Sequence, residues 1–318
     1  MKKLAMVIGM AAGLMCGAQA APLNAGQVGA NAKWVLHLDV EGLRATQVGK
    51  ILMQKLTTGD DNNRLNALAA MLGCDLRKDL AGVTLYGPSD VEDEGVVILH
   101  GKFNKQQLET FVKADDAYAS EDYKGATIHS WIDKKKNKRM YGTILAGGEA
   151  IVMSGANASV KAELDVLGGG SSLATQNEGK LSLGAANGSV LIAAADLAKM
   201  KSAKTSAQTL KFANSASASI SEQGADAVGT VVIEADSAQN AQQMNDALRG
   251  ILAMIQLNDK TDQNTKDALK ATGVDLQGTT LKISIHMPAQ TLADTLQKKM
   301  TEDDAKKAAS APTGTEQK

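Results

Sequence analysis

The stretch Val231-Val232-Ile233-Glu234-Ala235-Asp236, with residues 237–257 behind it, predicts the fold most directly. Its first residues are apolar and mostly β-branched, which is typical of a strand. Asp236 stands where a helix N-cap is preferred. The residues that follow repeat apolar side chains at helical spacing: Met244, Leu248, Ile251 and Ile255. The stretch therefore predicts a strand that turns directly into a long amphipathic helix.

A second copy of this arrangement lies near the start of the chain. Residues 34–39 alternate in the manner of a strand, Asp39 takes the place of Asp236, and Val40 to Leu56 follow as the helix. Each copy continues through a polar gap and a short helix to a Gly-x-Asp-Leu turn, at 73–76 and 273–276, and then to another strand. This repetition predicts an internal duplication.

The remaining segments alternate predicted strands with predicted helices. We expect an α+β fold of two related ferredoxin-like halves, with mostly antiparallel sheets and helices packed on one face. The first half is expected at residues 33–167 and the second at 188–300, joined by a Gly/Ser-rich linker at 168–187. Ser215 to Ile220 alternates small and polar residues, which predicts a weak or edge strand.

The beginning of the chain has the pattern of an export signal. Lys2 and Lys3 precede an apolar run that ends at Leu14, and Ala18-Gln19-Ala20 gives the small-x-small pattern before a cleavage site. The run is shorter than the roughly 20 residues needed to span a bilayer, so no transmembrane span is expected. We expect a signal peptide at 1–20, cleavage near Ala20-Ala21, and a product in the periplasm or outside the cell.

The composition limits the classes of function that the exported chain can have. The chain has 34 basic and 35 acidic residues, and this balance excludes a general nucleic-acid binder. Aromatic residues make up only 3%, which argues against an aromatic-lined binding platform. Cys16 falls within the signal, so Cys74 has no partner for an intramolecular disulfide and is interpreted as a small buried hydrophobe. Residues 21–32 are expected to be a flexible lead-in, and residues 301–318 a disordered tail.

The start of the expected mature chain resembles a group of uncharacterised exported bacterial proteins with duplicated strand–helix halves. The residues that carry this resemblance are Lys33-Trp34-Val35-Leu36-His37-Leu38-Asp39, with Leu43 and Gly49 after them. The resemblance implies an exported α+β fold. It implies no activity, and no functional residue is carried over from it.

Three polar residues are the nearest approach to a catalytic or metal site. His37 and Asp39 share one face of a predicted strand, and His100 lies on another strand. The simpler interpretation makes His37 a sheet residue and Asp39 a helix cap. If the three residues met in one deep pocket, the chain would instead be an exported hydrolase or a weak metal-dependent enzyme.

Two charged loops are candidates for binding. A predicted hairpin ends in a basic tip made of Lys134, Lys135, Lys136, Lys138 and Arg139. This tip could attach to an anionic surface or a glycan, although solubility alone also favours such a loop. Residues 90–95 have oxygen ligands at the first, third and fifth positions of a calcium loop, but position 12 is Gly101 where calcium loops carry an acid.

Motifs that would identify a reaction are absent from the sequence. It has no Gly-x-Ser-x-Gly, no Ser-x-x-Lys and no phosphate-binding glycine loop, and no cofactor is expected. We therefore expect an exported, non-catalytic binding or structural protein. Its partner is expected to be an envelope component or a protein on another cell's surface. The exported hydrolase and the anionic-surface binder remain the alternatives.

Overall fold

The computed structural model describes residues 21–55, 59–176, 181–183, 188–198, 200, 211–259, 261 and 263–310. The predicted signal peptide at 1–20 lies outside the described residues. Among the helices in the described ranges, none combines the length and the apolar character that crossing a membrane requires.

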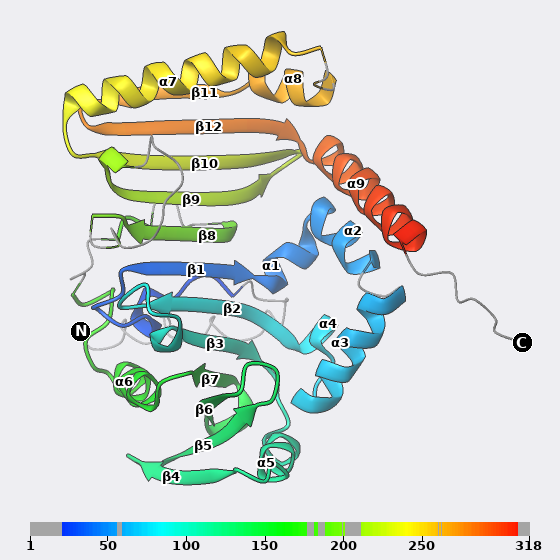
Figure 1. The fold of residues 1–318 in the computed structure, drawn as a ribbon, viewed down its shortest axis with the longest axis vertical. Helices are drawn as coiled ribbons and strands as arrows, with labels where there is room; N and C mark the ends of the chain where they lie inside the picture. The colour runs from blue at the N-terminus through cyan, green and yellow to red at the C-terminus, as the bar shows by residue number, and fades with distance from the viewer. Residues whose placement is uncertain are drawn as a thin grey trace, which may run out of the picture.

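The described residues include twelve strands that join in one sheet, and every ladder between neighbouring strands is antiparallel. The order across the sheet is β11-β12-β10-β9-β8-β1-β2-β3-β7-β6-β5-β4 (Figure 1). The strands are β1 (Trp34–Asp39), β2 (Leu80–Gly87), β3 (Val96–Gly101), β4 (Ala119–Tyr123), β5 (Ala126–Asp133), β6 (Lys138–Ile144), β7 (Ala150–Ser154), β8 (Ser189–Asp196), β9 (Ala213–Gln223), β10 (Asp226–Ala235), β11 (Gly273–Gln277) and β12 (Thr280–Pro288).

Helices connect the strands and confirm the α+β class. They are α1 (Val40–Ala45), α2 (Gln47–Lys55), α3 (Gly59–Leu72), α4 (Leu76–Asp79), α5 (Lys105–Lys113), α6 (Asn157–Leu167), α7 (Ala238–Leu257), α8 (Gln263–Lys270) and α9 (Ala289–Ser310). Asp39 caps α1 as expected, because its side chain accepts a hydrogen bond from the backbone N–H of Gly42. The cap of α7 is Ser237, one residue after the expected Asp236.

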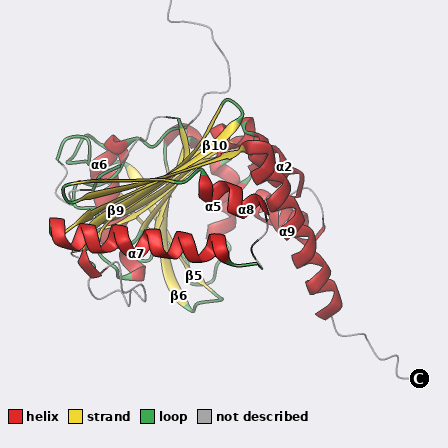
Figure 2. Ribbon diagram, turned by 90° about the horizontal axis from the view of Figure 1, so that it is seen from above, coloured by secondary structure: helices red, strands yellow, loops and turns green. Residues whose placement is uncertain are grey.

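The two faces of the sheet have different neighbours. One face, which we call the core face, carries Val35 and Ile98 and packs against Val160 of α6. The opposite face packs against Leu108 of α5 and Met244 of α7. Figure 2 shows α6 and α7 on opposite sides of the strands. The expectation of helices on one face is therefore wrong, because side chains of both faces are apolar and each face needs cover.

Two segments expected to be flexible pack into the core instead. In the predicted lead-in, Val28 and Ala32 are buried among core-face residues. In the predicted linker, Ser172 forms a β-bridge with Gly29, and Leu173 is buried beside Val28. Both expectations are wrong where the structure describes these segments, because their small apolar residues cover the core face that the helices leave open.

The end of the chain also differs from the prediction. Helix α9 continues to Ser310, so residues 301–310 are helical where a disordered tail was expected. Residues 311–318 lie outside the described residues. The predicted single helix from Val40 is divided in two at Thr46, whose hydroxyl donates to the carbonyl of Leu43.

The strand order is mirrored about the boundary between β8 and β1. β1 and β8 are neighbours there, and the hairpins β2–β3 and β9–β10 follow outward on either side. β7 and β12 come next, and each leads into a helix, α6 or α9. Like positions are therefore β1 with β8, whereas the sequence aligned β1 with β10. β9, which contains the predicted edge strand, lies inside the sheet between β8 and β10.

Candidate functional site

The predicted polar cluster is a structural anchor on the core face. Buried His37 lies opposite Thr84, and its Nδ1 is 2.9 Å from that residue's Oγ1. Its Nε2 is 2.8 Å from the carbonyl oxygen of Ala21. Buried Asp39 accepts hydrogen bonds at Oδ1 from the backbone N–H groups of Gly42 and Ala21, at 2.7 and 3.1 Å. Both His37 nitrogens therefore have hydrogen-bond partners, which leaves neither free for a metal ion.

His100 lies next to this anchor without completing a catalytic set. Burial lowers the pKa of His100, and the nearby His37 lowers it further. Burial also lowers the pKa of His37, so both rings are neutral near pH 7. No group of three His, Cys, Asp or Glu side chains suited to a metal ion occurs in the described part of the chain. The structure brings His37 and Asp39 together around Ala21, not around an open pocket.

Two ion pairs join the basic hairpin tip to the acidic turn. Lys136 Nζ is 2.5 Å from Glu92 Oε1, and Lys138 Nζ is 2.8 Å from Asp93 Oδ1. The hydrogen bond from Lys136 lowers the pKa of Glu92. Two carboxylates of the possible calcium loop thus have lysine partners, and two of the five basic groups are paired.

The other members of the basic tip differ in their contacts. The Arg139 guanidinium donates to the carbonyl oxygen of Ala117 and to Ser130 Oγ, both at 3.0 Å. Within the described residues, Lys134 and Lys135 form no ion pair. The free positive charge at the tip is therefore smaller than the five-residue sequence pattern indicates.

Cys74 is not an activated thiol. Burial raises its pKa to about 11, and the carboxylates of Asp79 and Asp75 raise it as well. The nucleophilic thiolate is therefore a negligible fraction at neutral pH.

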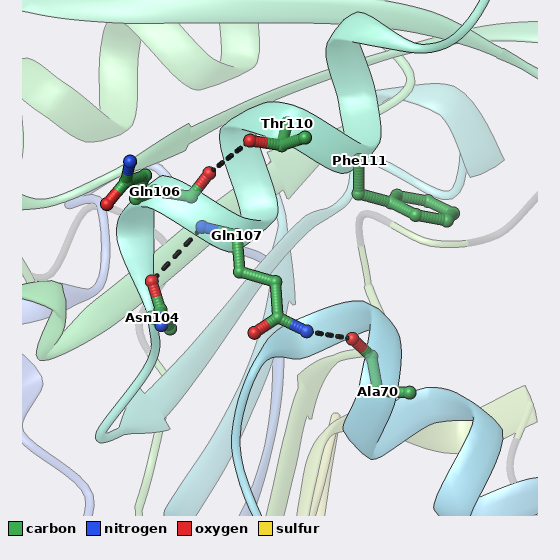
Figure 3. A pocket seen from close by; sticks show the side chains of 6 residues that line it. All are labelled: Ala70, Asn104, Gln106, Gln107, Thr110 and Phe111. Carbon is green, nitrogen blue, oxygen red and sulfur yellow. Dashed lines mark hydrogen bonds between the residues drawn. The ribbon is translucent and has the colours of Figure 1, made fainter.

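A hollow of about 440 Å³ lies between α3 and α5 (Figure 3). Its lining residues are Ala70, Asn104, Gln106, Gln107, Thr110 and Phe111. Gln107 spans it, because the side-chain amide donates to the carbonyl oxygen of Ala70 at 2.6 Å (Figure 3). None of these residues is ionisable, so the hollow offers no acid, base or nucleophile of its own.

One buried ionisable pair was not predicted from the sequence. The Tyr86 hydroxyl donates to Glu163 Oε2 beneath α6, and both residues are buried. Burial raises the pKa of Glu163 to about 8, although the hydrogen bond from Tyr86 acts in the opposite direction. Glu163 Oε1 is buried and has no hydrogen-bond partner among the described residues. The signal was available: Glu163 lies three residues after Val160 and three before Val166, on the apolar stripe of its helix.

An exposed apolar surface lies on the face opposite the core face, beyond the part that α7 covers. Cross-strand pairing aligns Leu38, Leu191, Ile220, Gly229 and Ile285 in one row. A second row contains Leu36, Ala193, Ala218, Val231 and Ile283. We call these two rows the open face.

Exposure shows that the open face lacks cover. Leu36 is 38% exposed, Ile220 is 41% exposed and Ile285 is 39% exposed. The next row, through Ile233 and Leu281, belongs to the core beneath α7. Contiguous apolar surface of this kind is typical of a binding site in proteins that are otherwise well packed.

Known proteins give little guidance for this chain. No protein-family model and no curated protein matches it. Three crystal forms of TP0453 are similar to it in structure. Form III is 12% identical, covers 89% of this chain and 100% of that chain, and has a TM-score of 0.49. Form IV is 11% identical over 88% and 98%, with a TM-score of 0.47, and form I is 11% identical over 87% and 98%, with a TM-score of 0.43.

Proposed function

We propose that this protein is exported and acts as a non-catalytic binding module whose binding surface is the open face. The observation that carries the proposal is the exposure of Leu36, Ile220 and Ile285 on β1, β9 and β12, alternate strands of one continuous sheet. Removing apolar surface of this kind from water is favourable by about 25 cal/mol for each Å², and this gain has to exceed the entropy lost on association. The partner is expected to present an apolar surface of its own.

The shape of the open face supports a broad contact. Gly229 lies between Ile220 and Ile285 in the cross-strand row and has no side chain, so the two isoleucines border a flat gap. Strand β9 contributes Ala218 to the next row, and its small side chain projects little above the sheet. A surface of few tall side chains suits an extended apolar partner better than a small polar substrate.

The ionisable groups of the described residues support binding over catalysis. The two His37 nitrogens and the Asp39 carboxylate are engaged with backbone and hydroxyl groups on the core face. The open face carries no such cluster in the ranges described. Export itself follows from the signal pattern at 1–20, and the partner would then be an envelope component or a protein on another cell's surface.

We also infer that the two halves of the chain are related. The mirrored strand order about β1 and β8 supports this inference, with α5 and α7 following β3 and β10 at like positions. The description of each half as ferredoxin-like stays a prediction.

Binding by the open face is tested with one triple variant and one control variant beside the wild type. The exported protein is immobilised and exposed separately to envelope extract and to intact foreign cells. The triple variant Leu36→Asp/Ile220→Asp/Ile285→Asp is compared with Val91→Asp, which adds a charge at a 51% exposed apolar residue outside the open face. We expect a component that the wild type and Val91→Asp retain and the triple variant loses, with circular dichroism confirming that all three are folded. Equal retention by all three proteins would contradict the proposal.

A further inference from the structure

Both backbone groups of Ala21 are held by residues of β1. The Ala21 N–H donates to Asp39 Oδ1 at 3.1 Å, and the Ala21 carbonyl oxygen is 2.8 Å from His37 Nε2. His37 and Asp39 are two residues apart on one strand, so both side chains point from the core face. Side chains that are almost completely buried therefore hold the first described residue of the chain.

The hydrogen bonds define the state of His37. A carbonyl oxygen only accepts, so Nε2 must carry the hydrogen that it donates to Ala21. In the neutral ring, Nδ1 then accepts from the Thr84 hydroxyl. Burial lowers the pKa of His37, which keeps this neutral form at physiological pH. His37 is thus a fixed donor to the Ala21 carbonyl.

The position of Ala21 suits a small first residue. Its methyl group lies over Gly82, which faces Asp39 across the β1–β2 ladder. A Cβ atom at Gly82 would lie 3.4 Å from the Ala21 Cβ and 3.5 Å from His37 Cε1. The absence of a side chain at Gly82 therefore leaves room for Ala21 beside the imidazole ring.

Asp39 has no cationic partner elsewhere in the described residues. It accepts two backbone N–H groups, and none of the ion pairs among these residues involves it. A buried carboxylate without an opposite charge is costly. An α-ammonium group at Ala21 would supply that charge, because the Ala21 nitrogen already lies 3.1 Å from Asp39 Oδ1.

We propose that removal of the signal peptide creates this charge, and that the new amino terminus at Ala21 binds Asp39 as a buried ion pair. The inference rests on the proposed export signal, whose small-x-small pattern ends at Ala20. A signal peptidase hydrolyses the Ala20–Ala21 amide. The water oxygen remains on the Ala20 carboxylate, and the Ala21 nitrogen gains protons to become an ammonium group. Because Asp39 also caps α1 through Gly42, processing strengthens the β1–α1 junction.

The experiment uses the complete gene, expressed with its signal and exported by the host. One variant inserts Gly-Ser between Ala20 and Ala21, so that the processed product keeps a peptide N–H at Ala21 but lacks a charge there. Each form is also made with Asp39→Asn, which removes the carboxylate charge and keeps a side chain that caps helices well. N-terminal sequencing and intact mass verify each product. Stability is measured by urea unfolding.

The expected result is a coupling between the insertion and Asp39. With Asp39 present, the insertion should lower the folding equilibrium constant by about tenfold or more, since it breaks a buried pair. In the Asp39→Asn background the insertion should change that constant by less than about twofold. The ordinary pKa of an α-amino group is about 8, and pairing raises it, so the advantage of the Ala21 terminus should be present below about pH 8 and disappear at higher pH.

Two results would overturn the proposal, and they have different meanings. An exported product that begins at another residue would show that the signal boundary, and with it the ion pair, is wrong. A product that begins at Ala21 but shows equal effects of the insertion in both backgrounds would overturn the ion pair alone. Neither result depends on partner binding, so the open-face proposal is tested separately.

Discussion

Replacing Glu163 by Gln should remove a specific pH dependence from the stability of this protein. Glu163 is fully buried and its pKa is raised to about 8 by burial. In the unfolded chain the carboxyl returns to its ordinary value of 4.5. The folded state therefore holds a proton that the unfolded state releases between these two values, and stability falls as pH rises through this window. The Gln side chain stays neutral throughout.

The size of the effect follows from the same two values. The interval from 4.5 to about 8 corresponds to a loss of at most roughly 5 kcal/mol, at about 1.4 kcal/mol for each pKa unit. The free energy of unfolding of wild type and Glu163→Gln should be similar below pH 4.5. Between pH 4.5 and about pH 8, the free energy of unfolding of the variant should rise relative to that of the wild type. Above about pH 8 the difference should stay constant.

Urea unfolding at half-unit steps from pH 4 to 9 measures this difference, since carboxylates common to both proteins cancel. Tyr86→Phe provides a second comparison, because the hydrogen bond from Tyr86 lowers the Glu163 pKa. Without that hydrogen bond the Glu163 pKa is higher, so the fall in stability with pH should continue above pH 8. A difference between wild type and Glu163→Gln that is independent of pH would refute the reasoning.

Three further predictions concern local structure. Gly49→Ala should destabilise the protein by at least about 2 kcal/mol in urea unfolding, because a Cβ there would lie 1.7 Å from a backbone carbonyl oxygen of α1. Its control, Gly250→Ala in α7, meets nothing within 4 Å and should be neutral or stabilising by up to about 1 kcal/mol. Cys74 should react slowly with iodoacetamide at pH 8 and faster only as the pH approaches its pKa of about 11; fast alkylation at pH 8 would contradict that pKa. Lys136→Glu should leave the thermal midpoint nearly unchanged, because its ion pair with Glu92 is exposed; a large decrease would show a structural role for the hairpin tip.

Local patterns predicted the elements of this fold well. Alternation located β1, a run of β-branched residues located the end of β10, and the cap at Asp39 has the geometry that its residue type favours. The hairpin around the basic loop also pairs as expected, with Trp131 opposite Met140. These features depend on residues close together in the chain, whose spacing is visible in the sequence.

Features that depend on contacts between segments far apart in the chain could not be predicted from the sequence. Segment 21–32 lacks strong periodicity, yet Val28 fills the core face, because small apolar residues suit the narrow space above the strands. The basic and acidic loops were each considered as a binding site, and only the tertiary fold brings Lys136 to Glu92. The open face is equally hidden, since Ile220 belongs to a strand that looked like an edge and lies inside the sheet.

The sequence pattern around His37 predicted correctly that His37 and Asp39 share a strand face, but it did not predict which group they bind. His37 and Asp39 do share a strand face, as the alternation indicates. Their shared partner is the backbone of Ala21, which a search for metal ligands or catalytic groups would not consider. Position 21 also follows the predicted cleavage site. Only the three-dimensional structure places this position beside His37 and Asp39.

Site-specific photo-crosslinking tests the central claim, binding by the open face, most directly. A benzoylphenylalanine is placed at Ile220 on the open face or at Val91 outside it, and each exported protein is irradiated with envelope extract or foreign cells. Our account predicts a discrete crosslinked product from position 220 and none from position 91. Crosslinking from position 91 with none from position 220 would contradict it.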